Sequence, residues 1–264
     1  MASSNAAKSA SRREQLRAAR EREAAAARRK RITVVAVAVV VAAVLVAVIA
    51  MAAGGVFGKR SGGSGATSTV VSVRPPHASP GDKGVFSADN VNDSAPVLTV
   101  IDDFQCPICH TYETVFGPVF ESLAKKGEIR LEYRTRYFLD INLKNDSSVR
   151  AARAAAIADT FGKYQEYHDT VFSNQPAKEG TGYTDDQLRN AFPQAAGITG
   201  DDLATFQSSY DKGEMNAFVD AVDRQAQADG YNGTPTFLAN DRKIDMPRKT
   251  NPTEDDIMKL VRGV

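Results

Sequence analysis

The chain has 264 residues, a formal net charge of +1 and 25% charged residues. A near-neutral charge gives no global indication of binding to nucleic acid, so we expect no nucleic-acid partner. Two cysteines are too few for a framework of disulfides. A folded domain in this chain must therefore rely on a hydrophobic core, which a sequence of this length is able to bury.

The N-terminal segment combines a basic cluster with a long apolar run. Residues 1–31 are rich in Lys and Arg, whereas residues 32–57 carry no charge. A basic cluster alone would indicate a solvated tail or a nucleic-acid arm, but about 20 apolar residues are enough to cross a bilayer. We therefore predict a cytoplasmic tail at 1–31 and a transmembrane signal anchor at 32–57, with the N-terminus in the cytoplasm. Cleavage after the small residues that end the run is the alternative, although the run is long for a cleavable signal.

The next segment changes composition. Residues 58–83 are rich in Gly, Ser and Pro, which is typical of a flexible linker. We expect one domain at 84–264, attached to the cell membrane by a single span and lying outside the cytoplasm. Disulfides persist in such a compartment.

The domain opens with a pattern of strand, helix and strand. Residues 95–104 form a β-branched run that predicts a buried strand. A helical pattern starts at Pro107 and should end near Gly127. Residues 128–138 alternate between apolar and polar and predict a second strand. The order corresponds to a βαβ unit.

A long helical region follows, and the chain then returns to strands. The helical patterns span 147–162, 163–175, 183–197, 199–210 and 214–230. Residues 233–240 and 241–246 are expected to pair as a hairpin. A last helix is predicted at 251–264, starting from Thr253 with acidic residues in its first turn.

The two cysteines, Cys106 and Cys109, fit three kinds of site. A structural zinc site commonly needs four ligands, and the three histidines of the chain are scattered, so we expect no metal. A structural disulfide across so short a loop would remove little entropy from the unfolded chain. A redox pair is favoured, because a Cys-x-x-Cys near a βαβ pattern is a redox signature. At the start of a helix, the N–H groups and the helix dipole would stabilise a Cys106 thiolate, and Cys109 would resolve mixed disulfides.

The sequence resembles the DsbA-like members of the thioredoxin superfamily. The resemblance is carried by "DFQCPIC", by the helical segment with "FGKYQEYHDTVFSNQ" and by "GTPTF". It implies an α/β thioredoxin fold, a central mixed sheet flanked by helices, with an inserted α-helical subdomain at about 145–230. It also implies a cis peptide bond between Thr234 and Pro235, opposite the cysteines and in contact with substrate.

Several positions near the cysteines differ from the pattern of this family. Val100 stands six residues before Cys106, where many relatives carry a buried acid. Asp102 and Asp103 lie nearer the turn, and we expect them to face solvent. Pro107 and Ile108 separate the cysteines, and Ile108 provides no hydrogen-bond donor to a thiolate.

Two further side chains are candidates for modulating the site. Glu113 matches an acid that is found near the site in relatives, and an exposed helix residue is the alternative interpretation. His110 follows the second cysteine, and we expect it to be a solvated helix residue. Pro107, Ile108 and Asp103 are also included among the residues expected to modulate the site.

The leading functional hypothesis is a dithiol oxidase outside the cytoplasm, with an exposed nucleophile at Cys106 and a resolving Cys109. Its substrates would be exported proteins with free thiols, and its only redox group the Cys106–Cys109 disulfide, without a further cofactor. The resemblance implies re-oxidation by a membrane protein of the DsbB or VKOR type, and a monomeric soluble domain. A reductase or isomerase of the same fold is the alternative. An anchored interaction module without enzymatic activity is the third hypothesis.

Overall fold

The structure is a computed structural model that describes residues 73–247 and 250–264. The predicted tail at 1–31, the predicted anchor at 32–57 and the first part of the predicted linker lie outside the described residues. Within the described part of the chain, no helix combines the length and the apolar character that crossing a bilayer requires.

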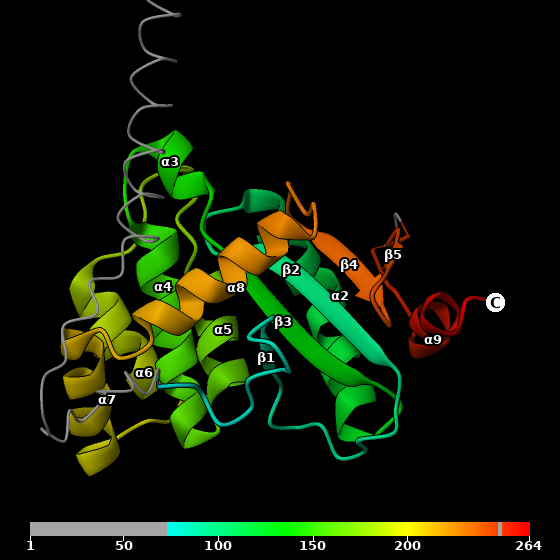
Figure 1. The fold of residues 1–264 in the computed structure, drawn as a ribbon, viewed down its shortest axis with the longest axis horizontal. Helices are drawn as coiled ribbons and strands as arrows, with labels where there is room; N and C mark the ends of the chain where they lie inside the picture. Colours follow the sequence, from blue (N-terminus) through cyan, green and yellow to red (C-terminus); the bar gives the residue numbers. More distant parts are fainter. Residues whose placement is uncertain (1–72, 248–249) are drawn as a thin grey trace, which may run out of the picture. The chain divides into compact units, whose positions relative to one another are not determined.

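A mixed sheet of five strands forms the centre of the domain (Figure 1). Its spatial order is β1-β3-β2-β4-β5. The strands are β1 (Val85–Phe86), β2 (Val97–Asp103), β3 (Arg130–Arg136), β4 (Thr236–Ala239) and β5 (Arg242–Ile244). Only the β2–β3 pair is parallel, whereas the other neighbouring pairs of this sheet are antiparallel.

The parallel pair is connected by helix α2 (Pro107–Lys125), which confirms the predicted βαβ unit. Pro107 occupies the first helical position, where its missing N–H removes no helical hydrogen bond. The helix ends at the cap residue Lys126, and Gly127 follows with a φ of +70°. Phe116 and Phe120 are buried on this helix, so α2 is fixed to the core while its N-terminus lies at the end of β2.

The predicted helical insertion lies between β3 and β4 and gathers beside the sheet, with α8 crossing in front of the strands in the view of Figure 1. Its helices are α3 (Leu139–Leu143), α4 (Ser147–Ala158), α5 (Tyr164–Ser173), α6 (Phe192–Ala195), α7 (Gly200–Lys212) and α8 (Asn216–Ala228). A 3-10 turn follows α4 at Asp159–Phe161, and a π-helical turn, Gln187–Ala191, precedes α6. The short α3 was not predicted, and Asp140 in its first turn accepts backbone hydrogen bonds from the start of α4.

The C-terminal elements agree with the expected hairpin and helix. Strands β4 and β5 pair antiparallel, and α9 (Glu254–Arg262) follows. Thr253 caps α9 through a reciprocal pair of hydrogen bonds with Asp256, which satisfies two backbone donors of the first turn.

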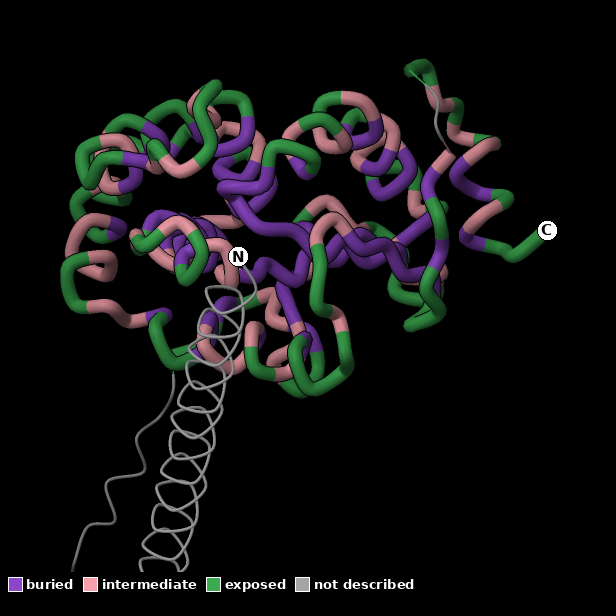
Figure 2. Tube along the Cα trace, turned by 90° about the horizontal axis from the view of Figure 1, so that it is seen from above, coloured by how far each residue is buried: buried purple, intermediate pink, exposed green. Residues whose placement is uncertain are grey.

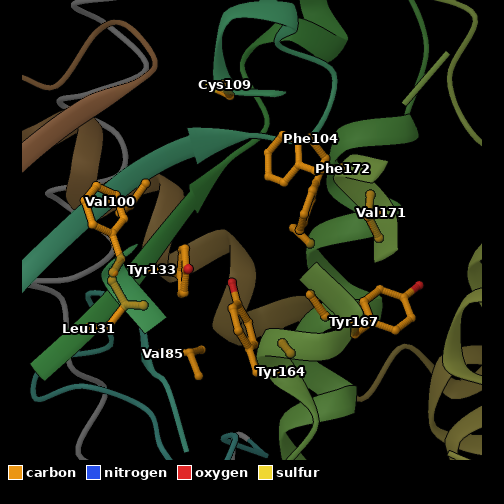
Figure 3. Packing of buried hydrophobic residues seen from close by; sticks show 14 of the residues in the cluster. Val85, Val100, Phe104, Cys109, Leu131, Tyr133, Tyr164, Tyr167, Val171 and Phe172 are labelled. Carbon is orange, nitrogen blue, oxygen red and sulfur yellow. The ribbon is translucent and has the colours of Figure 1, made fainter. Parts of the chain in front are cut away.

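The hydrophobic core extends from the sheet into the helical insertion, as the continuous purple regions of Figure 2 show. Figure 3 shows aromatic side chains between the β2–β3 strands and α5, among them Phe104, Tyr133, Tyr164 and Phe172. His168 is completely buried among these rings, and its ring centroid lies 4.2 Å from that of Tyr133. The sheet and the insertion therefore share one core, and a polar side chain lies inside it.

The predicted linker at 58–83 includes residues that belong to the folded domain. Ala78 forms a β-bridge with Val85, and Ser79 is buried. The backbone N–H of His77 donates to Asp159 at 2.8 Å, and the His77 ring contacts the same carboxylate. The prediction was wrong for residues 73–83 because these long-range contacts attach a Pro-rich segment to the domain, and composition alone does not reveal them.

Candidate active site

The two cysteines lie at the junction of β2 and α2. Cys106 is the N-cap of α2, and its backbone N–H donates to the carbonyl of Asp103 at 2.8 Å. Its extended backbone conformation turns the side chain back over the first helical turn, so Sγ accepts from the N–H of Cys109 at 3.4 Å. Both cysteines are free thiols. The structure thus describes a reduced dithiol in which one sulfur acts as the helix cap.

The surroundings of Cys106 stabilise its thiolate. The pKa of Cys106 is lowered from 9.0 to about 6, chiefly because the thiol of Cys109 donates a hydrogen bond to it, and this outweighs the opposing effect of burial. The Thr234 side chain and the N–H groups of Cys109 and Ile108 lower this pKa further. The Thr234 hydroxyl is buried without a hydrogen-bond partner of good geometry among the described residues. Cys106 is therefore ionised at neutral pH.

Cys109 has the opposite character. Burial, the hydrogen bond to Cys106 and the negative charges of Cys106 and Asp102 raise the pKa of Cys109 well above its usual value. Cys106 retains 6% of its exposed area and Cys109 retains 3%. The expectation of an exposed Cys106 was therefore wrong, because the residue is nearly buried. The two cysteines differ more in the charge of their sulfurs than in their exposure to solvent. Ile108 between them is 57% exposed and offers an apolar surface.

The Thr234–Pro235 segment forms the wall opposite the cysteines. The peptide bond between these residues is cis, and the Cys106 thiol lies 3.6 Å from the carbonyl oxygen of Thr234. A groove of about 410 Å³ begins at this wall and continues along β4 and β5. Ile108, Tyr112, Pro235, Phe237, Lys243 and Met246 are among its lining residues. The predicted residues Pro107, Ile108, Thr234 and Pro235 therefore surround the cysteine pair.

Behind the cysteines, Asp102 and His168 form a buried pair. His168 Nε2 lies 2.7 Å from Asp102 Oδ2, and both side chains are almost fully buried. Burial opposes protonation of the imidazole, but hydrogen bonds to Asp102 and Asp169 prevail and raise the pKa of His168 to about 10. The expectation that Asp102 faces solvent was wrong. Alternation along β2 places it on the same face as Val100, which is itself buried.

Asp103 is also buried, contrary to the expectation. Its carboxylate accepts hydrogen bonds from the N–H groups of Gln105 and Leu139 and from the hydroxyl of Ser148. Burial nevertheless raises the pKa of Asp103 to about 7. These contacts join the end of β2 to α3 and α4, so Asp103 holds the turn that carries Cys106.

Glu113 and His110 border a different surface from the groove. Glu113 is half-buried, and burial raises the pKa of its carboxyl to about 7. It lines a pocket of about 310 Å³ between α2 and α5, together with His110, Glu121 and Asp169. His110 is only partly exposed, and its Nδ1 is buried without a hydrogen-bond partner among the described residues. The expected solvated histidine is therefore partly enclosed, and Glu113 lies apart from the cysteine groove.

Sequence reasoning missed Asp102 and His168 as parts of the site. Alternation in β2 was the available signal for Asp102, because Val100 and Asp102 share one face of the strand. No local pattern connects Asp102 with His168, which lies 66 residues later in the chain. Among the described residues, the group with spacing suitable for a metal consists of Glu113, His168 and Asp169 and includes neither cysteine.

Comparison with known proteins agrees with the fold described above. A family model described as thioredoxin matches residues 92–261. The reduced disulfide bond oxidoreductase DsbG from Mycobacterium tuberculosis is 26% identical with a TM-score of 0.54, and the match covers 71% of this chain and 90% of that one. Oxidised DsbA from the same organism is 25% identical with a TM-score of 0.50, covering 62% and 85%.

A third solved structure supports the fold alone. The thiol-disulfide oxidoreductase MdbA from Actinomyces oris is 20% identical with a TM-score of 0.57, and the match covers 70% of this chain and 89% of that one. No match was found among curated proteins.

Proposed function

This chain belongs to the thioredoxin family as a thiol–disulfide oxidoreductase of the DsbA type, and we propose that it acts outside the cytoplasm as a dithiol oxidase. The observation that carries the proposal is the contrast between the two sulfurs, with a pKa of about 6 for Cys106 and a strongly raised pKa for Cys109. A stabilised Cys106 thiolate favours the reduced form of the pair. A pair that gains stability on reduction takes electrons from other thiols.

The proposed reaction consists of two exchanges. A substrate thiolate attacks Sγ of Cys106 in the Cys106–Cys109 disulfide, the bond between the two cysteines breaks, and Cys109 leaves and takes up a proton. A second substrate thiolate then attacks the substrate sulfur of the mixed disulfide, and Cys106 leaves as a thiolate. Two electrons move from the substrate dithiol to the cysteine pair, and the substrate gains one disulfide.

The groove next to Cys106 is the proposed binding surface for the substrate chain. Thr234 and Pro235 border both the Cys106 sulfur and the groove. An extended peptide would form main-chain hydrogen bonds along this segment, as in strand addition. Ile108, Tyr112 and Phe237 provide apolar contacts within the groove that suit partly folded chains with exposed hydrophobic residues.

The proposed location and partners follow from the sequence. The predicted anchor at 32–57 would hold the domain at the outer face of the cell membrane, where exported proteins with free thiols pass. The reduced pair then needs an electron acceptor, and we propose a membrane re-oxidase of the DsbB or VKOR type. The anchor would keep the domain and this partner in the same membrane.

A reductase or isomerase is the second candidate, because the exposed Ile108 provides no side-chain donor to the Cys106 thiolate. The reduction potential of the pair distinguishes the two candidates and is measured by equilibration of the full-length chain with glutathione buffers. A value near about −120 mV, as in DsbA, is expected for an oxidase, whereas a value near about −270 mV, as in thioredoxin, would refute that direction.

Two cysteine variants test the third hypothesis, an interaction module without enzymatic activity. Cys106→Ser is expected to abolish oxidation of a reduced peptide. Cys109→Ser, mixed with glutathione disulfide, is expected to accumulate a mixed disulfide through Cys106 as one glutathione thiolate leaves. If the Cys106→Ser variant oxidises the peptide at the rate of the unmodified chain, the cysteine pair is not the catalytic group.

A further inference from the structure

We propose that Glu113, His168 and Asp169 form a binding site for a divalent transition-metal ion of the zinc type, between α2 and α5. One ligand atom from each of these three residues lies within 4.8 Å of the other two. The residues border or underlie the pocket of about 310 Å³ on the side of α2 that faces α5. The site is separate from the cysteine groove.

His168 has the arrangement of a metal-ligating histidine. One nitrogen of its ring, Nε2, lies 2.7 Å from the buried carboxylate of Asp102. The other, Nδ1, has only a 3.5 Å contact with Asp169 Oδ1. A histidine ligand usually donates one ring N–H to a carboxylate, which fixes its orientation and leaves the other nitrogen for the metal. Asp102 thus orients the ring. In the metal-free chain the Nδ1–H faces Asp169, so a zinc ion would take the place of this proton.

The pocket has room for the carboxylate of Glu113. A Cβ atom at Gly117 would lie 2.4 Å from Glu113 Oε1, so the carboxylate in its present position occupies the space left by the missing side chain. Asp169 is held from the other side, because Gln165 Nε2 donates to its Oδ1 at 2.9 Å. His110 lines the same pocket with an unpartnered Nδ1 and is available as a further donor.

The charge of the pocket favours a cation. Glu113, Glu121 and Asp169 line it, and the described lining residues include no lysine or arginine. Imidazole suits zinc and other late transition metals, whereas calcium and magnesium prefer oxygen ligands alone. Zinc binds nitrogen and carboxylate oxygen at about 2.0–2.2 Å. In the tetrahedral arrangement that zinc prefers, neighbouring ligand atoms lie about 3.4 Å apart, so atoms that now lie within 4.8 Å of one another have to approach by up to about 1.4 Å through rotation of the side chains.

The test uses zinc chloride and the full-length chain with the Cys106–Cys109 disulfide formed, so that the thiols do not bind the ion. Equilibrium dialysis with metal analysis is expected to find one zinc per chain, with a rise in Tm on binding. Glu113→Gln and Asp169→Asn are each expected to weaken the affinity at least tenfold and to remove the rise in Tm. Both carboxylates are partly exposed, so these variants should fold, whereas replacement of the buried His168 is expected to disturb folding.

Glu121→Gln is the matched control, because it removes the same charge from the same pocket but lies outside the group of three. Its affinity is expected to change less than threefold. A hundredfold excess of calcium should not displace the zinc. The proposal is overturned if the oxidised chain binds no zinc, if Glu121→Gln weakens binding as much as Glu113→Gln, or if calcium displaces the ion.

Discussion

The two sides of α2 differ in chemistry although they share the turn that carries the cysteines. Toward β4 and β5, the groove mixes apolar groups such as Ile108 and Phe237 with polar ones such as Lys243 and Asp245. Toward α5, the pocket is lined by the carboxylates of Glu113 and Asp169, with the buried His168 behind them. The comparison teaches that one helix separates a surface suited to a polypeptide from a surface suited to charge. The reactive Cys106 sulfur lies next to the first surface, 3.6 Å from the carbonyl oxygen of Thr234.

The largest expected effect concerns the buried pair on the charged side. His168→Gln removes the partner of Asp102, and leaving a buried charge uncompensated is expected to lower the free energy of unfolding by about 3–5 kcal/mol. Asp169→Asn is the control, because its carboxylate is 39% exposed and 3.5 Å from the ring, so a loss of at most about 1 kcal/mol is expected. Urea unfolding of the reduced chains with a chelator present measures both. Equal losses of unfolding free energy in the two variants would show that the Asp102–His168 pair stabilises the fold no more than the exposed carboxylate of Asp169 does.

The second prediction concerns the charge of Cys106. Only the thiolate reacts with iodoacetamide, so the rate of alkylation should rise with pH up to the pKa near 6 and stay level above it. In Cys109→Ala the main hydrogen bond to the thiolate is lost, and the midpoint should move upward. Mass spectrometry of alkylated peptides locates the label. A midpoint near 9 in the unmodified chain would contradict the proposed activation.

The same shift predicts how the stability of the reduced chain depends on pH. The pKa of Cys106 is about 6 in the folded chain, below its ordinary value of 9.0. Ionisation of Cys106 therefore stabilises the folded form fully above about pH 9, and this contribution is lost as pH falls through about 6. Chemical unfolding measures the free energy of unfolding of the reduced chain and of Cys106→Ser over this pH range. The difference between the two free energies should become smaller at acid pH. If the difference in unfolding free energy between the two chains does not change with pH, ionisation of Cys106 does not stabilise the folded form.

A smaller effect is expected at Ile108 on the rim of the groove. Ile108→His places a donor and a partial positive charge beside the Cys106 thiolate, which should lower the pKa of Cys106 and make the pair more oxidising. A tenfold change in the glutathione equilibrium constant corresponds to about 30 mV, and a change of this order is expected. Ile108→Gln, which adds a donor without charge, should show a smaller change. An unchanged potential in both variants would show that this position does not tune the pair.

The smallest expected effect is at Lys243, an exposed residue of the groove next to Cys106. Lys243→Glu should slow the oxidation of acidic peptides and speed that of basic ones by about threefold or less, because an exposed charge acts mainly on association. The difference between the two peptides should shrink in high salt. If Lys243→Glu changes the oxidation rates of the acidic and basic peptides by the same factor at low salt, the substrate does not bind in this groove.

Much of the fold was predictable because its signals are local. Pro107 marks the start of α2, and Thr253 marks the start of α9 through a capping pattern that spans three residues. The βαβ unit and the β4–β5 hairpin follow from periodicity and short connections. Strand β1 and α3 were not predicted, because they are short and depend on contacts with distant elements.

The sequence by itself predicted the redox pair, because two cysteines three positions apart at a strand–helix junction leave few other uses for them. It also determined the positions of Ile108 and Pro235 as candidates for the rim and the opposite wall. Only the tertiary structure decided which acids lie inside the protein. Asp102 is buried because α5 brings His168 to it from 66 residues away, and Asp103 because α3 and α4 close over the turn. The physical reason is that burial depends on what covers a residue, and such long-range packing leaves no mark in the local sequence.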